Sequence, residues 1–133
     1  MVNPFKQQGA FSWCELMTTD TAAAKNFYQQ IFGWELRDQP IDGMTYTVIK
    51  AGDSDVGGLM AKPPDAPDMP TSWGIYVTVD DVDATAEQVK ALGGQVMMSP
   101  TDIPDVGRFA LIQDPQGAVL SIITYLPMSD SPD

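Results

Sequence analysis

Hydrophobic and polar positions recur along this chain at a spacing of 60 residues. Residues 12–36 read SWCELMTTDTAAAKNFYQQIFGWEL, and residues 72–96 read SWGIYVTVDDVDATAEQVKALGGQV. Six of these 25 aligned positions are identical, where unrelated sequences of ordinary composition would share about one or two. The identities fall where a strand, a helix start and a helix end are expected. The pattern therefore predicts two copies of one structural unit.

Each copy begins with a strand that is followed by a helix. Residues 11–18 and 73–79 are strand candidates, and the second segment is rich in aromatic and β-branched residues. Asp20 in the first copy, and Asp80 or Asp81 in the second, offer a carboxylate to the open amides of a helix start.

Each predicted helix carries an apolar stripe at the spacing of one helical face, which we expect to be buried against a sheet. Gly33 and Gly93 follow the stripes, at positions where a left-handed helix end favours a residue without a β-carbon. The stripe residues are Ala24, Phe27, Tyr28 and Ile31 in the first helix, and Val82, Ala86, Val89 and Leu92 in the second.

Three short strands are predicted after each helix, so the pattern is βαβββ twice. The strands are residues 34–39, 44–51 and 56–61 in the first copy, and 95–99, 108–113 and 118–125 in the second. Turn residues such as Asp42-Gly43 and Gly107 separate them. The predicted organisation is a first module at 1–61, a stiff Pro-rich linker at 62–71, a second module at 72–126 and a polar tail at 127–133.

One helix covers one face of a four-stranded sheet and leaves the other face to be buried elsewhere. The second module is available to meet that face. We therefore expect an α+β fold in which two βαβββ modules form curved mixed sheets around a shared cleft. Such a cleft is where ligand binding or catalysis is expected.

Composition narrows the partners and the chemistry. The 133 residues include 18 acidic and 7 basic side chains, for a net charge of −11. A surface this negative disfavours nucleic acid and anionic membranes as partners. The chain has no histidine, which removes the commonest general base and zinc ligand. Its single cysteine, Cys14, forms no disulfide within the chain, and no apolar segment of signal-peptide length is present, so we expect a soluble cytoplasmic protein.

The repeat, with its helix-capping and turn residues, resembles the vicinal oxygen chelate superfamily. This superfamily includes glyoxalase I, the bleomycin- and fosfomycin-resistance proteins and the extradiol dioxygenases. The resemblance runs from about residue 11 to residue 125. Its motifs are Thr19-Asp20, Phe27-Tyr28 and Ile31-Phe32-Gly33-Trp34 in the first half, and Val79-Asp80-Asp81-Val82-Asp83, Leu92-Gly93-Gly94 and Asp114-Pro115-Gln116-Gly117 in the second. The segment 102–109 is similar to a bacterial subgroup known as glyoxalase-like.

The resemblance implies a divalent metal held by His, Glu or Gln side chains at matching points of the two halves. In this sequence those points fall on Trp13, Gly74, Ser121 and the stretch 57–59. Trp and Gly side chains are not ligands, and a lone Ser hydroxyl is a weak one. We therefore expect no metal and no cofactor at the family's usual site.

The candidate ligand-binding residues are placed by strand alternation and by the family's ligand positions. They are Trp13, Glu15, Tyr46, Met60, Gly74, Tyr76, Arg108 and Ser121. Trp13 offers a flat apolar wall, or it fills the core as a plug. Glu15 follows on the same strand face, where burial is expected to raise its pKa, and it is the candidate general acid or base. The alternative is a solvent-facing Glu15 or one paired with Arg.

The other candidates keep similar alternatives. Gly74 leaves room for a ligand beside Tyr76. Taken singly, Tyr46, Met60, Tyr76 and Ser121 are better explained as ordinary sheet residues. Arg108 is expected either to bind a ligand carboxylate through its planar guanidinium or to form an ion pair with an aspartate such as Asp102 or Asp105. Cys14 has the opposite alternation to Trp13 and is expected to face the helix as a small core residue.

These observations favour a protein that binds a small molecule without a metal. Like the bleomycin-resistance proteins of the superfamily, it is expected to sequester its ligand rather than to transform it. The alternative is a lyase, isomerase or dioxygenase-type enzyme of the same superfamily that uses Glu15 as acid and base or a non-standard metal site. The resemblance also implies that two copies of the chain pair as a homodimer.

Overall fold

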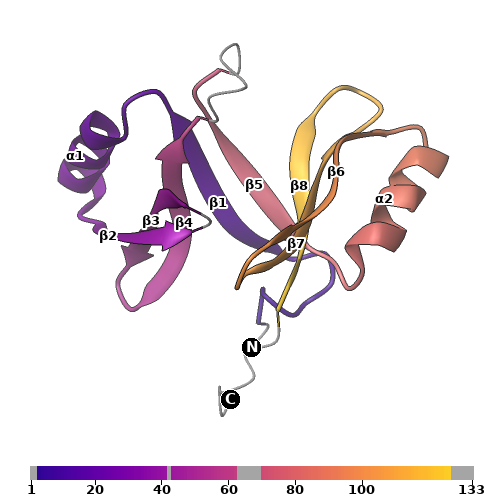
Figure 1. Cartoon of the computed structure of the whole chain (residues 1–133), viewed down its shortest axis with the longest axis horizontal. Coiled ribbons are helices and arrows are strands. Elements are labelled where there is room, and N and C mark those ends of the chain that lie inside the picture. Colours follow the sequence, from indigo (N-terminus) through magenta and orange to yellow (C-terminus); the bar gives the residue numbers. More distant parts are fainter. Residues whose placement is uncertain (1–2, 42, 63–69, 127–133) are drawn as a thin grey trace. The chain divides into compact units, whose positions relative to one another are not determined.

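The computed structural model describes residues 3–41, 43–62 and 70–126. Most of the predicted linker, residues 63–69, and the predicted tail, residues 127–133, lie outside this description. The elements in chain order are β1 (Phe11–Thr18), α1 (Thr21–Phe32), β2 (Glu35–Ile41), β3 (Met44–Ala51), β4 (Ser54–Ala61), β5 (Ser72–Thr78), α2 (Val82–Ala91), β6 (Gln95–Ile103), β7 (Gly107–Gln113) and β8 (Val119–Tyr125) (Figure 1).

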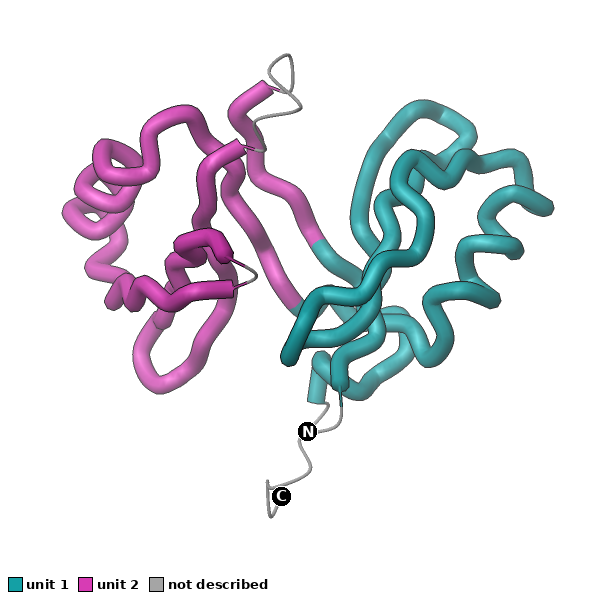
Figure 2. The backbone as a smooth tube through the Cα atoms, in the orientation of Figure 1, with its two compact units in different colours: residues 1–12, 76–133 teal, residues 13–75 magenta. Residues whose placement is uncertain are grey.

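The chain forms two compact units, which Figure 2 colours separately. Unit 1 consists of residues 1–12 and 76–133, and unit 2 consists of residues 13–75. Each unit contains one βαβββ arrangement of strands and helix, so the predicted α+β class with two such modules is confirmed.

In unit 2 the strand order is β2-β3-β4-β1, with β1 parallel to β4 and the remaining neighbours antiparallel. Leu16, Ile49 and Leu59 form the buried core on the face that α1 covers. Ala24 and Tyr28 of α1 pack against this core. Burial of these apolar side chains is the main force that holds α1 on the sheet.

In unit 1 the strand order is β5-β8-β7-β6, with β5 parallel to β8. The buried core consists of Val79, Val82, Ala110 and Ile122. Val82 opens α2, so the first turn of the helix is fixed directly on the core.

Residues 3–12 are bound to the end of β5 in unit 1. The backbone N–H of Thr78 donates to the carbonyl of Ala10, and its hydroxyl donates to the carbonyl of Pro4 at 2.6 Å. The ring of Phe5 meets the ring of Tyr125 edge to face, with centroids 5.0 Å apart. The N-terminal residues therefore belong structurally with the C-terminal half of the chain.

Two strands extend further than the sequence predicted. β2 continues through Pro40 to Ile41, and β6 continues through Pro100 to Ile103. Both are the outer strands of their units. An outer strand tolerates proline because the missing N–H is not needed on its open side. The predicted ends at residues 39 and 99 were therefore wrong.

The helix starts and stripes are partly as predicted. Asp20 caps α1 and Asp81 caps α2, each accepting a backbone N–H three residues on. The predicted stripe on α1 is wrong for Phe27 and Ile31, which are each 58% exposed. Since α1 packs through Ala24 and Tyr28, its buried face is narrower than the apolar pattern suggested.

Among the described residues, neither helix is long and apolar enough to cross a membrane.

Candidate functional site

The candidate site in unit 2 lies on the face of the sheet opposite to α1. Leu16 points into the core beneath α1, so its strand neighbour Glu15 lies on the opposite face of β1. Trp13, Glu15 and Met17 share the second face by their spacing of two. In the parallel pairing of β1 with β4, Glu15 is opposite Gly58 and Met17 is opposite Met60.

Three side chains on this face are joined by hydrogen bonds, and we call them the Trp13–Tyr46–Glu15 chain. The indole Nε1–H of Trp13 donates to the hydroxyl oxygen of Tyr46 at 2.8 Å. The Tyr46 hydroxyl donates to Oε2 of Glu15 at 2.7 Å. Glu15 is buried, with 8% of its surface exposed. The structure therefore brings together three of the residues that the sequence analysis named.

Gly58 gives the Tyr46 ring its place. A β-carbon built at position 58 would collide with the hydroxyl and ring atoms of Tyr46. Gly58 lies opposite Val48 on β3 and opposite Glu15 on β1. A glycine inside a strand therefore serves here for the close approach of a side chain.

Met60 and Gly74 complete the predicted set in this unit. Met60 is partly buried beside Met17. A β-carbon added to Gly74 would come no closer than 3.9 Å to its nearest neighbour, the backbone oxygen of Glu15. Position 74 therefore offers space, but its packing does not require glycine.

The remaining candidates lie in unit 1. Tyr76 and Ser121 are directly opposite each other in the pairing of β5 with β8, and each is 8% exposed. The ring of Tyr76 lies near that of Phe109, with centroids 6.3 Å apart. These residues form a second small polar and aromatic group on the sheet of unit 1.

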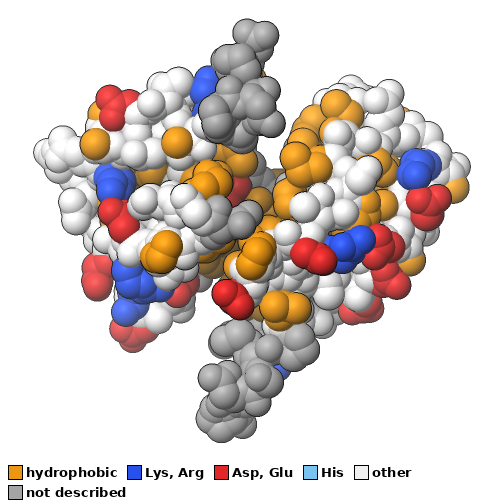
Figure 3. Space-filling view, viewed as in Figure 1, with side chains coloured by type: hydrophobic (Ala, Val, Ile, Leu, Met, Phe, Trp, Pro, Cys, Tyr) orange, Lys and Arg blue, Asp and Glu red, His pale blue; other side chains and the backbone are white. Residues whose placement is uncertain are grey.

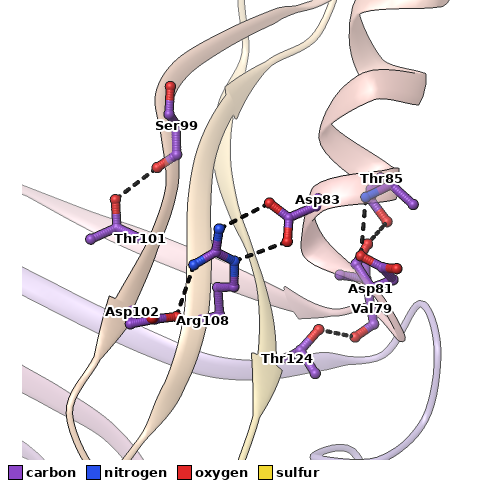
Figure 4. A network of polar contacts seen from close by, with 10 residues as sticks. Val79, Asp81, Asp83, Thr85, Ser99, Thr101, Asp102, Arg108 and Thr124 are labelled. Carbon is purple, nitrogen blue, oxygen red and sulfur yellow. Dashed lines mark hydrogen bonds and ion pairs between the residues drawn. The ribbon is translucent and has the colours of Figure 1, made fainter.

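Arg108 is bound by two aspartates, as Figure 4 shows. Its guanidinium makes a two-pronged contact with Asp83 on α2, both distances being 3.0 Å, and a third contact with Asp102 on β6 at 2.9 Å. The hydrogen bond from Arg108 holds the pKa of Asp83 below its usual value. The same partners raise the pKa of Arg108. Arg108 thus ties α2 to β6 and β7.

A surface recess of about 350 Å³ adjoins this ion-pair network in unit 1. It is lined by acidic residues, including Asp80, Asp81, Asp83 and Asp102, around Arg108. Within the described residues, no group of three or more His, Cys, Asp or Glu side chains is arranged to hold a metal ion. The contacts at Arg108 agree with a role in tying elements together.

Other basic side chains are also paired with aspartates. Lys25 on α1 lies 3.1 Å from Asp38 on β2, and Arg37 lies 3.5 Å from Asp55 on β4. Hydrogen bonds from Thr47 and Lys25 lower the pKa of Asp38. On the face drawn in Figure 3, several basic side chains accordingly lie against acidic ones. These exposed pairs each contribute little to stability.

The residues present do not fit the metal centre that the resemblance implies. The indole of Trp13 is a donor without a lone pair to offer, and it is directed at Tyr46. The space over Gly58, at the stretch where a further ligand is expected, holds the Tyr46 ring. Gly74 has no side chain, and Ser121 has one hydroxyl. We therefore derive no chemistry through a metal at these positions.

Two residues differ from their sequence-based interpretation. Cys14 is exposed, so the prediction of a small core residue is wrong. The packed cluster on that side of β1 includes Leu16 but does not extend to position 14. Gly58 was considered only as a metal-ligand position, although a glycine inside a strand is itself a signal of close approach.

Comparison with known proteins places the chain in a family. The family model of the Glyoxalase/Bleomycin resistance protein/Dioxygenase superfamily matches residues 10–122. The Mycobacterium tuberculosis protein named "Putative glyoxylase CFP32" is 44% identical over 122 residues, which cover 91% of this chain and 46% of that protein. "Anthracycline biosynthesis protein DnrV" of Streptomyces peucetius is 32% identical over 129 residues, with coverage of 86% and 46%. The chain thus spans about half the length of these curated relatives.

Solved structures show the same fold at low sequence identity. Methylmalonyl-CoA epimerase from Mycobacterium tuberculosis superposes with a TM-score of 0.69 at 15% identity, covering 96% of this chain and 94% of that one. The hypothetical protein BH1468 from Bacillus halodurans superposes with a TM-score of 0.72 at 13% identity, covering 94% of this chain and 100% of that one. The chain therefore belongs to the Glyoxalase/Bleomycin resistance protein/Dioxygenase superfamily, the family that the sequence motifs indicated.

Proposed function

We propose that this protein binds a small molecule on the Trp13–Tyr46–Glu15 face of unit 2 and that binding requires no divalent metal. The observation that carries the proposal is the chain of hydrogen bonds from Trp13 through Tyr46 to Glu15. It begins at Trp13, one of the positions where the resemblance places a metal ligand. An aromatic wall beside a few fixed polar groups is the usual composition of a small-molecule site.

A planar ligand suits these side chains. The face of the Trp13 indole offers an apolar surface for stacking, while its N–H is fixed by Tyr46. Met17 and Met60 provide an adaptable apolar flank. One relative is named for anthracycline biosynthesis, and anthracyclines contain fused planar rings that stack on aromatic side chains.

The alternative proposal is an enzyme in which Glu15 is the acid and base. It is supported by the 2.7 Å hydrogen bond from Tyr46, which orients the carboxylate. A carboxylate held in this way takes a proton from a carbon next to a carbonyl and returns it to the product. That chemistry corresponds to an isomerase or lyase of the same superfamily.

A fluorescence titration tests the first proposal. Protein purified without chelators is first analysed for bound metals, and it is then titrated with an anthracycline aglycone in the presence of EDTA. We expect saturable quenching of tryptophan emission that is lost in Trp13→Ala and retained in Trp73→Phe. Stoichiometric zinc, nickel, iron or manganese, or no response to the planar ligand, would contradict metal-free binding. Proton exchange into a carbonyl substrate that is lost in Glu15→Gln would favour the enzyme.

Pairing of two chains remains part of the proposal, since it follows from the family resemblance. Light scattering during gel filtration compares the mass in solution with the 14.4 kDa of one chain. A mass of one chain across a range of concentrations would exclude a stable homodimer.

A further inference from the structure

The outer face of α1 is apolar and exposed. Phe27, Ile31 and Phe32 are each 58% exposed, although each is a large apolar side chain. The helix packs on its sheet through Ala24 and Tyr28. Figure 1 shows α1 beside the sheet of unit 2, with its outer side turned away from the strands. The apolar surface of this helix is therefore wider than the sheet that it covers.

The exposed side chains belong to a continuous group of rings around α1. Neighbouring ring centroids in this group lie between 4.9 and 6.2 Å apart. Trp73, at the start of β5, belongs to it and is 41% exposed. All of its members lie in unit 2. We call this group, together with Ile31, the α1 aromatic patch: Phe27, Tyr28, Ile31, Phe32, Trp34 and Trp73.

The patch is held in place from below. Tyr28 and Trp34 pack against the buried core of unit 2. The indole N–H of Trp73 donates to the hydroxyl oxygen of Tyr28 at 3.2 Å. Rings that are already ordered lose little conformational entropy when a partner covers them. Aromatic side chains of this kind are also the residues that dominate binding energy in protein interfaces.

The two helices of the repeat differ on their outer faces. The one charged side chain of α1, Lys25, is paired with Asp38 at 3.1 Å. At the repeat spacing of 60, Phe27 corresponds to Glu87. A helix face in contact with water is normally charged or polar, so α2 has the usual outer face and α1 does not. The exposed charged side chains of α2 are Asp83, Glu87 and Lys90.

The charge pattern favours a second copy of this chain as the partner. A net charge of −11 makes two copies repel each other wherever acidic surfaces meet, and the outer face of α1 contains no acidic side chain. Its exposed polar side chains are amides, which both donate and accept hydrogen bonds and so suit an identical face. They are Asn26, Gln29 and Gln30.

Other partners fit this face less well. Because Lys25 is already bound to Asp38, the face offers no unpaired charge for a strongly acidic or basic protein to recognise. A helix that lies on a membrane surface is rich in Lys and Arg on its polar side, and α1 has a single Lys.

The size of the patch agrees with pairing of two copies. Aromatic side chains present about 150–250 Å² each, so the exposed parts of Phe27, Phe32 and Trp73, with Ile31, amount to about 400 Å². Apolar atoms contribute about 57% of a protein interface, which implies a contact of about 700 Å² per copy. A standard stable interface buries about 800 Å² per partner.

We propose that the α1 aromatic patch is the surface through which two copies of this chain pair, with the two α1 helices meeting across a twofold axis. The inference rests on the pairing included in the proposed function and names the surface that pairs. In a twofold interface each contact occurs twice. Phe27 and Ile31, one helical turn apart, therefore meet the same two residues of the other copy, and one substitution removes two sets of contacts.

The first experiment measures mass by light scattering during gel filtration over a range of concentrations. We expect the wild type to have twice the mass of one chain. Phe27→Glu introduces the residue found at the equivalent position 87 and is expected to raise the dissociation constant of the pair at least about 30-fold. Leu92→Glu is the matched control, because Leu92 is an apolar residue of unit 1 that is 71% exposed, and its mass is expected to equal that of the wild type.

Circular dichroism confirms that Phe27→Glu is folded before its mass is compared. A pair that survives Phe27→Glu at every concentration, or one that Leu92→Glu disrupts equally, would overturn the assignment of the surface.

The second experiment leaves every ring of the patch in place. Gln30 on α1 and Gln88 on α2 are both exposed, and each is replaced by cysteine in a Cys14→Ser background. A short bis-maleimide is expected to join two chains covalently in Gln30→Cys but not in Gln88→Cys. Adding Phe27→Glu to Gln30→Cys is expected to abolish the cross-link. Equal cross-linking of the two cysteine variants, or none in Gln30→Cys, would overturn the pairing of α1 helices.

Failure of this inference and failure of the proposed function give different results. A wild type with the mass of one chain at every concentration would overturn both the proposed pairing and the surface. A pair that forms through another face would keep the proposed pairing and overturn the surface alone. The anthracycline titration in EDTA decides small-molecule binding independently of either mass measurement.

Discussion

The phenol ring of Tyr46 lies in the space that a β-carbon at position 58 would occupy, so Gly58 and Tyr46 are mutually dependent. Gly58→Ala is expected to displace the ring and to lower the free energy of unfolding by about 1–3 kcal/mol, the usual cost of overpacking. Urea unfolding followed by circular dichroism measures this change. Gly74→Ala is the matched control, because its added methyl group meets its nearest neighbour at 3.9 Å. Equal destabilisation by the two substitutions would contradict the specific role of Gly58.

The helix caps give a second prediction that separates two adjacent aspartates. Asp81 accepts the backbone N–H of Ala84 at 3.1 Å and caps α2, although the repeat aligns Asp80 with the α1 cap Asp20. Asp81→Ala is expected to cost about 1 kcal/mol in unfolding free energy. Asp80→Ala is expected to change it by less than about 0.5 kcal/mol. A larger loss of unfolding free energy in Asp80→Ala than in Asp81→Ala would contradict the assignment of the helix cap to Asp81.

The Arg108 ion pairs predict how stability depends on pH. Arg108 lowers the pKa of Asp83 in the folded protein from its usual value of 3.8. A carboxyl whose folded pKa is depressed contributes stability that is present above its unfolded pKa and is lost as the pH falls through the folded pKa. The difference in Tm between the wild type and Arg108→Gln should therefore be full at neutral pH and shrink below about pH 4.

Thermal melts between pH 2 and 7, followed by circular dichroism, measure this difference. Lys90→Gln is the control, since Lys90 pairs with Glu87 within the exposed surface of α2 and does not join different elements. A Tm difference for Arg108→Gln that is constant across the acid range would contradict the pairing with Asp83.

The exposure of Cys14 predicts a chemically accessible thiol in the folded protein. An aromatic disulfide reagent should modify one thiol per chain without denaturant, since the chain has a single cysteine. The released chromophore is measured by absorbance, and Cys14→Ser gives the background. Modification that occurs only in urea would show that the side chain is protected after all.

Much of the fold could be predicted because its signals are local. The strand at residues 11–18, the capping aspartate at position 20 and the left-handed Gly33 all occur as the sequence indicated. Local patterns do not say which strand lies at the edge of a sheet. The extensions through Pro40 and Pro100 depend on that tertiary fact, and so they were missed.

The same reason limits prediction of the helix face and the site. The apolar spacing of Phe27 and Ile31 resembles that of buried residues, but the sheet of unit 2 meets α1 through Ala24 and Tyr28. Alternation along β1 predicted that Trp13 and Glu15 share a face. The contact of Tyr46 with both depends on strand register and on the missing side chain at position 58, which a repeat pattern does not encode.

Unit 1 is built from two stretches that are far apart in sequence, residues 1–12 and 76–133, whereas unit 2 is continuous. A ribosome makes Pro4 and Ala10 long before it makes Thr78, to which both are hydrogen-bonded. Pro4 and Ala10 therefore lack this native partner while all of unit 2 is synthesised. Contacts of such high sequence separation slow folding, so we expect the continuous unit 2 to fold before unit 1 during translation.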